Sequence, residues 1–365
     1  MHFEDGVIAS VARSETARDN LLAQNKTVLY LGDRPVILPD GFILPDEELL
    51  NERLESLSDY DVVEFYSPRR FQVYYKNDST DNALVVTTKC NSNCIMCPVP
   101  EPIRMHASLE KIGHLCNLID YMPTDAPFLT ITGGEPTMLR EDTFILLQRL
   151  KDHFEGTKFF FLTNGRTLAI NSFFDSFMDV IPEEFRFGIP LYGYDDESHD
   201  RITQAKGSFD QTTKAIQKLL NHRCEVEIRI VVSNLNARNM DRIARYIADH
   251  YSGLACVNIM ATEMCGAAAA NKDLVWLDYE DCFRYSKKAV HILLEHGIDV
   301  RFYNFPLCKV ERSYWAMCSK SITDYKITYY EQCRNCSVKT ACGGVFGTTL
   351  AVTKMELHPI GDSNA

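Results

Sequence analysis

The sequence predicts an α/β protein, in which a partial (β/α)6 barrel of the TIM type lies between a small β-rich N-terminal region and a cysteine-rich C-terminal extension. Three observations support this expectation. Apolar strand segments alternate with helical periods along the middle of the 365-residue chain, loops rich in cysteine or glycine follow the first two strands, and cysteines gather again near the end. Six strand–helix units in succession favour a parallel sheet with helices outside it.

The barrel is expected over residues 81–303. Its strand candidates are ALVVTT (83–88), FLTIT (128–132), KFFFLT (158–163), FRFGIP (185–190), VEIRIVV (226–232) and CVNIM (256–260). Helical periodicity falls between them, at 107–121, 141–153, 208–221, 238–250 and 278–296. Because chemistry in such folds takes place at the carboxyl ends of the strands, the loops after the strands are where site residues are expected.

The regions on either side of the barrel have different compositions. Residues 1–80 contain the short apolar runs TVLYLG, RPVILP and FQVYY between turn residues, which predicts a small β-rich region. Two interpretations of this region stay open: it docks a peptide by strand addition, or it is a scaffold or oligomer contact. Residues 304–365 carry five of the cysteines and form the extension.

Composition restricts the compartment and the partners. The formal net charge of −12 disfavours nucleic acid as a partner, because no global field attracts phosphates. There is no apolar run of about 18 residues, and the charged N-terminal segment does not resemble a signal peptide. Thirteen cysteines without an export signal indicate a reducing, cytoplasmic setting in which clustered thiols bind metal. No membrane contact is expected.

A cysteine triad directly follows the first barrel strand. The segment T-T-K-C-N-S-N-C-I-M-C-P places Cys90, Cys94 and Cys97 in a C-x3-C-x2-C spacing. One short loop with this spacing can wrap an iron–sulfur cluster, and three thiolates for four irons leave one iron open for catalysis. Two other interpretations are three core cysteines and a zinc site, although zinc usually needs a fourth nearby ligand.

A second motif, I-T-G-G-E-P-T at 131–137, follows the second strand. Gly133 and Gly134 allow the backbone to approach a ligand closely. Glu135 can accept a hydrogen bond from an ammonium group, and Pro136 fixes the turn. By itself, Gly-Gly-Glu-Pro is also an ordinary turn; its place one strand–helix unit after the triad makes the motif specific.

These two motifs resemble those of the radical S-adenosylmethionine (SAM) superfamily, and the resemblance covers roughly residues 82–303. It implies that the triad binds a 4Fe–4S cluster and that the Gly133–Pro136 motif binds the methionine part of SAM. It also implies cofactor contacts for Arg229 in the fifth strand and for Asn164 in L-T-N-G at 162–165. The alternatives are an ordinary arginine and a plain turn. Met96 stands where many relatives have an aromatic residue, and it is expected to pack against the adenine of SAM as a soft apolar surface.

The segment after the fourth strand, residues 194–210, resembles an H-D-x-x-R-G-x-x-G-S-F segment of peptide-modifying members, with Lys206-Gly207 in a shifted place. His199 and Asp200 in it are interpreted either as substrate contacts or as residues that cap and anchor the loop, and anchoring is the more common role.

The C-terminal segment C-R-N-C-S-V-K-T-A-C-G-G contains Cys333, Cys336 and Cys342. It resembles the auxiliary-cluster (SPASM or twitch) domains of peptide-modifying radical SAM enzymes. No cysteine follows Gly-Gly, so one auxiliary 4Fe–4S cluster is expected, with Cys308 as the first choice for the fourth ligand and Cys318 as the second. Four thiolates suit zinc equally well. The other cysteines, which lack ligand spacing, are expected in the core: 116, 224, 256, 265 and 282.

Together with P-L-C and S-I-T-D-Y-K before them, these motifs resemble the His-Xaa-Ser system radical SAM maturase, the C protein of that system. The resemblance implies an oxidoreductase that cleaves SAM to a 5′-deoxyadenosyl radical and modifies a ribosomally made precursor peptide. It also implies an external reductant of the flavodoxin or ferredoxin type, and it allows for a partner maturase. The alternatives are a radical SAM enzyme that acts on a small molecule or RNA, and a non-enzymatic zinc-binding module.

Overall fold

The computed structural model of the chain describes residues 3, 6–321 and 326–361. It contains two compact units. The first unit comprises Met1–Thr87, Leu109–Phe161 and Ser176–Phe185, and the second comprises Thr88–Ser108, Leu162–Asp175 and Arg186–Ala365. Each unit is described by itself.

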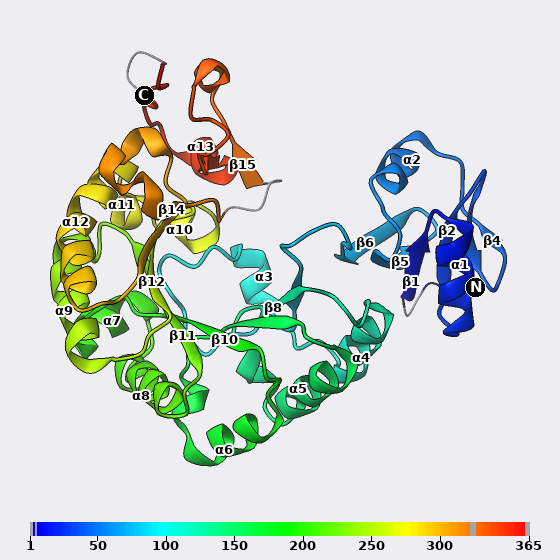
Figure 1. Ribbon diagram of the computed structural model, residues 1–365, viewed down its shortest axis with the longest axis horizontal. Helices are drawn as coiled ribbons and strands as arrows, with labels where there is room; N and C mark the ends of the chain where they lie inside the picture. The colour runs from blue at the N-terminus through cyan, green and yellow to red at the C-terminus, as the bar shows by residue number, and fades with distance from the viewer. Residues whose placement is uncertain (1–2, 4–5, 322–325, 362–365) are drawn as a thin grey trace. The chain divides into compact units, whose positions relative to one another are not determined.

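The N-terminal part of the first unit is a six-stranded sheet with two helices (Figure 1). Its strand order is β4-β3-β2-β1-β5-β6, in which only β1 and β2 run parallel. The elements are β1 (Val7–Ala12), α1 (Glu15–Ala23), β2 (Val28–Leu31), β3 (Pro35–Leu38), β4 (Phe42–Ile43), α2 (Glu48–Glu55), β5 (Val62–Ser67) and β6 (Arg70–Tyr75). Alternate strand residues such as Val11, Leu29 and Phe65 are fully buried and form its core with Leu50 and Leu54 of α2.

This sheet is joined to helix α4 (Ile112–Tyr121) of the same unit by side-chain hydrogen bonds. The Ser10 hydroxyl donates to the main-chain oxygen of Tyr121 over 3.1 Å, and the Thr27 amide donates to the Tyr121 hydroxyl over 3.3 Å. Nε2 of His114 lies 3.0 Å from Oε1 of Glu64, which is buried. The β-rich region is therefore an integral part of the first unit.

The second sheet has eight strands in the order β14-β13-β12-β11-β10-β9-β8-β7. The pairs β7–β8, β8–β9, β10–β11, β11–β12, β12–β13 and β13–β14 are parallel. The strands are β7 (Ala83–Val85), β8 (Phe128–Thr132), β9 (Lys158–Leu162), β10 (Phe185–Pro190), β11 (Glu225–Val232), β12 (Cys256–Ala261), β13 (Val300–Tyr303) and β14 (Cys318–Ser319). Sequential order and parallel direction confirm the predicted partial barrel of strand–helix units.

Helices connect successive strands. They are α3 (Glu101–Met105), α4, α5 (Asp142–His153), α6 (Asn171–Val180), α7 (Asp196–Thr203), α8 (Ser208–Asn221), α9 (Met240–His250), α10 (Gly266–Ala270), α11 (Lys272–Val275) and α12 (Tyr279–Glu295). In the second unit, α8, α9 and α12 lie along the outer side of β11 and β12 (Figure 1). Alternation along β11 buries Ile228 and Ile230, as expected for a strand covered by helices.

The C-terminal extension consists of short elements. They are β15 (Ile327–Thr328), which pairs antiparallel with β16 (Val345–Phe346), and α13 (Gly347–Val352). Among the helices of the described residues, none combines the length and the apolar character needed to cross a membrane.

Candidate functional site

The cysteine triad lies in the second unit, in a loop that we call the cluster loop and define as residues 89–99. Hydrogen bonds from the main chain fix its middle: the Asn93 amide donates to the oxygen of Thr203, and the Ile95 amide donates to the oxygen of Ile202, each over 2.9 Å. Both acceptors lie on α7, the helix after β10. The middle of the loop is thus held by main-chain hydrogen bonds to α7.

Polar side chains after β9 hold the first part of the same loop. Nδ2 of Asn164 donates to Oδ1 of Asn91 over 2.6 Å and lies 3.8 Å from Sγ of Cys90. Nη1 of Arg166 donates to the main-chain oxygen of Asn91, and it reaches the Ser92 hydroxyl over 3.1 Å. The L-T-N-G segment and the arginine after it therefore position the loop at Cys90.

Cys94 is half-buried, and its thiol lies near the other two thiols of the triad. Burial, together with the neighbouring thiols of Cys90 and Cys97, raises the pKa of Cys94 to about 12. Three thiolates in one partly buried loop need a cationic centre to be stable, which is what a cluster of iron ions supplies. In the described part of the chain, no three His, Cys, Asp or Glu side chains already stand in the arrangement of a bound metal. The residue types fit the cluster, and the three cysteines stay its predicted ligands.

Met96, between the second and third cysteines, is only 5% exposed and packs in an apolar cluster. Its neighbours there include Ile202 of α7 and Met264, which follows β12. Tyr192, at the end of β10, borders the same cluster, and burial together with the thiols of Cys94 and Cys97 raises the pKa of Tyr192. Met96 thus anchors the loop to the core, and its contact with adenine stays a prediction.

The Gly-Gly-Glu-Pro motif lies in the first unit, directly after β8. A side chain at Gly133 is not tolerated, because its Cβ would lie 2.2 Å from the main-chain oxygen of Thr87. The Gly134 amide donates to that same oxygen over 2.8 Å. Glu135 is fully buried, and its Oε1 accepts hydrogen bonds from the Thr137 amide and hydroxyl at 3.2 and 2.7 Å. Both glycines and the glutamate therefore fix the turn after β8.

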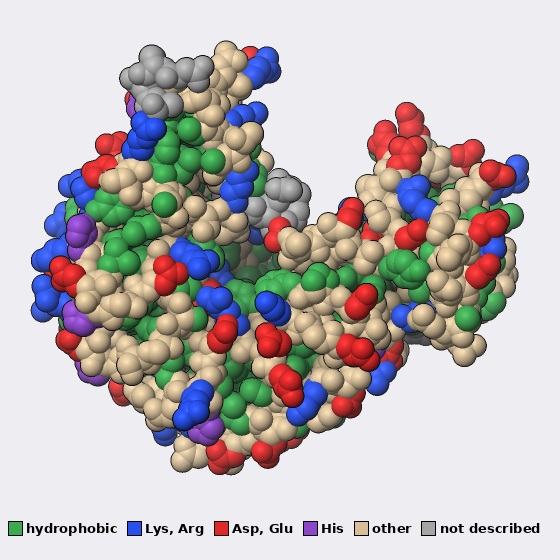
Figure 2. Space-filling model, in the orientation of Figure 1, with side chains coloured by type: hydrophobic (Ala, Val, Ile, Leu, Met, Phe, Trp, Pro, Cys, Tyr) green, Lys and Arg blue, Asp and Glu red, His purple; other side chains and the backbone are tan. Residues whose placement is uncertain are grey.

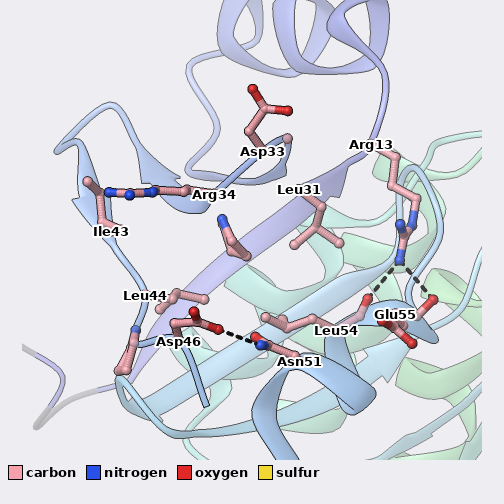
Figure 3. A pocket seen from close by; sticks show the side chains of 13 residues that line it. Arg13, Leu31, Asp33, Arg34, Ile43, Leu44, Asp46, Asn51, Leu54 and Glu55 are labelled. Atoms are coloured by element: carbon pink, nitrogen blue, oxygen red, sulfur yellow. Dashed lines mark hydrogen bonds between the residues drawn. The ribbon is translucent and has the colours of Figure 1, made fainter. Parts of the chain in front are cut away.

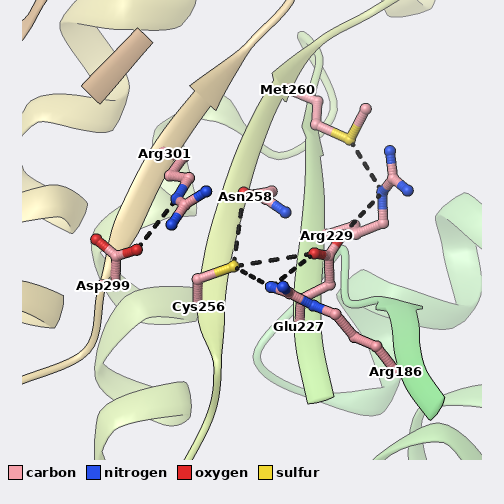
Figure 4. A network of polar contacts seen from close by, with 8 residues as sticks. All are labelled: Arg186, Glu227, Arg229, Cys256, Asn258, Met260, Asp299 and Arg301. Atoms are coloured by element: carbon pink, nitrogen blue, oxygen red, sulfur yellow. Dashed lines mark hydrogen bonds and ion pairs between the residues drawn. The ribbon is translucent and has the colours of Figure 1, made fainter. Parts of the chain in front are cut away.

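Arg229 points from β11 into a polar network of the second unit (Figure 4). Its Nε lies 3.4 Å from Sδ of Met260 and 3.8 Å from Oε1 of Glu227. Glu227 is buried and also pairs with Nη2 of Arg186 over 3.1 Å. One carboxylate thus holds two guanidinium groups on the sheet face opposite the helices. Cys256 belongs to this network, and burial beside Glu227 raises the pKa of its thiol to about 11.

His199 and Asp200 lie on α7, which Asp195 caps by accepting from the Ser198 amide over 2.9 Å. Asp200 accepts hydrogen bonds from the Ser208 hydroxyl and the Phe209 amide at 2.7 and 2.8 Å, and these bonds anchor the start of α8. Nδ1 of His199 accepts from the Tyr192 amide over 3.1 Å. The geometry favours the anchoring interpretation over direct substrate contact.

The C-terminal cysteines line one small cavity of the second unit. The lining includes Cys308, Cys333, Cys336 and Cys342, together with Tyr329 and His358. Burial raises the pKa of the Cys308 thiol, and the thiols of Cys342 and Cys333 raise it further. Four cysteines around one space fit either a cluster or zinc. Residues 322–325 of the S-I-T-D-Y-K motif lie outside the described residues.

Cys318 does not line this cavity. Its thiol lies 3.7 Å from the main-chain oxygen of Tyr314, and burial, with a smaller effect from Cys342, raises its pKa to about 12. This placement favours Cys308 over Cys318, and the fourth ligand stays a prediction.

Some contacts of the cluster loop were not visible in the sequence. For Arg166 the sequence gives a weak indication, because this residue directly follows the L-T-N-G segment. For the segment after β12 the sequence gives no indication. There, the Ala267 amide donates to the oxygen of Cys97 over 2.9 Å, and Nδ2 of Asn271 donates to the oxygen of Ile95 over 3.1 Å. These residues are about 170 positions away from the loop, so only the fold brings them together.

The family described as the Radical SAM superfamily matches residues 84–247. No curated protein matches the chain.

Solved structures with similar folds include SuiB from Streptococcus suis bound to its precursor peptide SuiA, with a TM-score of 0.48 and 12% identity over 68% of this chain. The anSMEcpe structure with bound AdoMet has a TM-score of 0.47 and 16% identity; the similarity covers 60% of this chain and 63% of that one. A domain of pyruvate-formate lyase-activating enzyme from Bacteroides vulgatus has a TM-score of 0.38 and 19% identity; it covers 47% of this chain and 96% of that one. The chain spans about half, 54%, of the length of SuiB.

Proposed function

Because residues 84–247 match the Radical SAM superfamily, we propose that this protein is an oxidoreductase that reductively cleaves SAM and uses the resulting 5′-deoxyadenosyl radical to modify a ribosomally made peptide. The observation that carries the proposal is the cluster loop, in which three cysteines follow the first barrel strand and the thiol of Cys94 lies under the electrostatic influence of the other two. When bound there, a 4Fe–4S cluster with one open iron supplies the electron that splits the sulfonium of SAM.

The residues of the chain would bind and orient this group. Cys90, Cys94 and Cys97 are the proposed thiolate ligands. Asn164 and Arg166 hold the loop at Asn91, which fixes the direction of the Cys90 side chain. Rigid support of this kind matters because a cofactor site loses function when its ligands shift by about 1 Å.

Two further groups of residues are proposed to bind SAM. The turn at Gly133, Gly134, Glu135 and Pro136 is proposed to bind the methionine part of SAM, because it follows the strand β8 at the carboxyl end of the barrel sheet. Arg229, held in place by Glu227, is the proposed partner of the SAM carboxylate, for which a guanidinium group is well suited.

The C-terminal cavity is proposed to hold a second, auxiliary 4Fe–4S cluster, with Cys308, Cys333, Cys336 and Cys342 as ligands. The support is that all four cysteines line the same cavity. An auxiliary cluster can accept an electron from the substrate radical after hydrogen abstraction, or it can anchor the substrate. A flavodoxin or ferredoxin is the proposed electron donor to the first cluster. The proposal is also compatible with a second maturase that acts together with this protein.

The peptide is proposed to dock on the N-terminal sheet. A cavity of about 620 Å³ lies between β3, β4 and α2, within the size range of ligand sites (Figure 3). Leu31, Leu44 and Leu54 line it together with charged residues such as Asp33, Arg34 and Asp46. Ile43, on the edge strand β4, is 56% exposed, so an extended peptide can add to this edge by main-chain hydrogen bonds.

The charges around this cavity favour a basic peptide. Acidic side chains gather over α2 (Figure 2), and the exposed ones there are Asp46, Glu48, Glu52 and Glu55. Two arginines, Arg13 and Arg34, also line the cavity, and Nη2 of Arg13 donates to the main-chain oxygens of Leu54 and Glu55 over 2.8 Å each (Figure 3).

The experiment that tests the activity is anaerobic reconstitution with iron and sulfide, followed by incubation with SAM and dithionite. We expect brown protein that forms 5′-deoxyadenosine, measured by mass spectrometry. The variant Cys94→Ala should reduce this formation to background, because only two thiolates remain. Cys116→Ala, which changes a half-buried cysteine on α4, is the control and should behave as the wild type.

Failure of the wild type to form 5′-deoxyadenosine, or equal formation by Cys94→Ala, would contradict the proposal. Colourless protein that contains zinc would favour the binding module instead. Adding a precursor peptide with His-Xaa-Ser repeats, encoded beside the gene, tests the peptide substrate through a mass change of that peptide. A small molecule or RNA becomes the better candidate if the peptide stays unchanged while SAM is cleaved.

A further inference from the structure

The segment after β12, residues 263–276, holds the cluster loop on one of its sides. We call it the bridge segment; it contains α10 and α11. The Ala267 amide donates to the oxygen of Cys97 over 2.9 Å, and Nδ2 of Asn271 donates to the oxygen of Ile95 over 3.1 Å. Both bonds end on main-chain oxygens of the loop, so the bridge segment fixes the path of the backbone between the second and third cysteines.

The approach of the two backbones requires a glycine. Gly266 has a φ of +55°, and a Cβ there would lie 2.3 Å from the main-chain oxygen of Val99 and 2.8 Å from the carbonyl carbon of Pro98. Only a residue without a side chain fits both the left-handed backbone and the close contact. The position of α10 against the loop is therefore tightly defined.

The bridge segment also contacts the C-terminal extension. The Met264 amide donates to the hydroxyl of Thr349 on α13 over 3.0 Å, and Nζ of Lys272 donates to the main-chain oxygen of Val352. Thr349 is fully buried. Val352 packs against the apolar cluster that contains Met264 and Met96. Residues from the cluster loop, the bridge segment and the extension thus share one core.

The extension leads from this contact directly to the C-terminal cavity. Thr349 follows Cys342 by seven positions in the sequence, and the segment between them contains β16 and the start of α13. The Gly344 amide lies 3.4 Å from Sγ of Cys342. A shift of Cys342 would move β16 and α13, because closely packed interiors transmit displacement rather than absorb it.

We propose that the bridge segment couples the two cysteine sites, with Thr349 as a positioning residue. In this coupling, the position of Cys342 in the C-terminal cavity sets how firmly α10 holds the cluster loop at Cys97. This proposal rests on the proposed function in one respect, namely that the loop carries a cluster. The coupling runs through contacts within the protein, so it can be measured in metal-free protein.

The test compares Thr349→Val with the wild type. The change keeps the shape of the side chain and leaves the buried Met264 amide without an acceptor, which is more costly than an ordinary lost hydrogen bond. In metal-free protein, we expect hydrogen exchange in the cluster loop to become about tenfold faster, measured by mass spectrometry of its peptides. In reconstituted protein, iron release from the first cluster to a chelator should accelerate by a similar factor, and the SAM-induced change in its electron paramagnetic resonance spectrum should weaken.

Two variants control for a merely structural effect. Thr349→Ser keeps the hydroxyl and should restore the exchange rate and the spectrum. Thr157→Val removes another buried threonine hydroxyl, which donates to the Ala126 oxygen over 2.5 Å in the first unit, and it should leave the cluster loop unchanged. Should Thr349→Val not fold, Lys272→Met removes only the second tether and should change the loop in the same direction by a smaller factor.

The inference is overturned if Thr349→Val accelerates exchange in α13 but leaves the cluster loop and its spectrum as in the wild type. It is equally overturned if Thr349→Ser behaves like the valine variant, or if Lys272→Met, used in its place, leaves exchange in the loop unchanged. Failure of the proposed function looks different: the wild type then holds no SAM-responsive cluster, while hydrogen exchange in metal-free protein still decides the coupling.

Discussion

The amide of Ala267 donates a hydrogen bond to the main-chain oxygen of Cys97, with 2.9 Å between the two atoms. This bond joins the loop after the first barrel strand to the segment after β12. The carbonyl of Cys97 needs a hydrogen-bond partner, and the Ala267 amide supplies it. The glycine before Ala267 is the residue that makes this approach sterically possible.

The first prediction concerns that glycine. Gly266→Ala places a Cβ 2.3 Å from the oxygen of Val99 on a backbone with φ of +55°. We expect the free energy of unfolding to fall by about 1–3 kcal/mol, because α10 must move away from the loop. Urea denaturation of the metal-free protein measures this loss, and the iron content after reconstitution should also decrease.

The matched control is Gly297→Ala. Gly297 has a φ of +72°, but a Cβ added there would meet no atom within 4 Å, so the substitution strains the backbone without a clash. Its cost should stay at about 1 kcal/mol, with full iron loading. Equal iron loss in both variants would mean that backbone strain, and not the contact with the cluster loop, causes the effect.

The second prediction assigns the fourth ligand of the C-terminal site. Cys308→Ala should reduce the iron content from about eight to about four atoms per chain, because Cys308 lines the cavity with the other three cysteines. Cys318→Ala is the control and should keep all the iron, since Cys318 lies outside the cavity lining. Iron and sulfide analysis decides between them, and the reverse pattern would make Cys318 the ligand.

The barrel elements were largely predictable because their apolar periods are regular. The predicted strands 128–132 and 185–190 and the predicted helix 208–221 coincide with β8, β10 and α8. The helix α7 was missed, since its sequence D-E-S-H-D-R-I-T is mostly polar and its stability comes from caps and from packing at Ile202. The strands β13 and β14 were also missed. They have four and two residues, which are too few to show the alternation of apolar and polar residues expected of a strand.

The candidate site was predictable only where its signal is local. The spacing of Cys90, Cys94 and Cys97 is such a signal, and so is the Gly-Gly-Glu-Pro turn. The contacts that orient the loop are different: they join it to Arg166, Ala267 and Asn271 across long stretches of chain. Residue types as common as alanine and asparagine have no recognisable pattern, so their role appears only once the fold brings them to the loop.

The last prediction concerns His199 and the pH dependence of stability. The imidazole is 1% exposed, and burial lowers its pKa in the folded protein from 6.5 to about 4. The unfolded chain therefore binds more protons between pH 6.5 and pH 4, so stability is fully present above this window and falls as the pH falls through it. At about 1.4 kcal/mol per pKa unit, the loss amounts to about 3 kcal/mol.

Urea denaturation of metal-free protein from pH 8 to pH 4 measures this effect in the wild type and in His199→Gln. The variant loses the acceptor of the Tyr192 amide and should be less stable at pH 8. Because glutamine does not titrate, the difference between the two proteins should shrink as the pH falls below 6.5. Parallel curves over the whole pH range would contradict the lowered pKa of His199 in the folded protein.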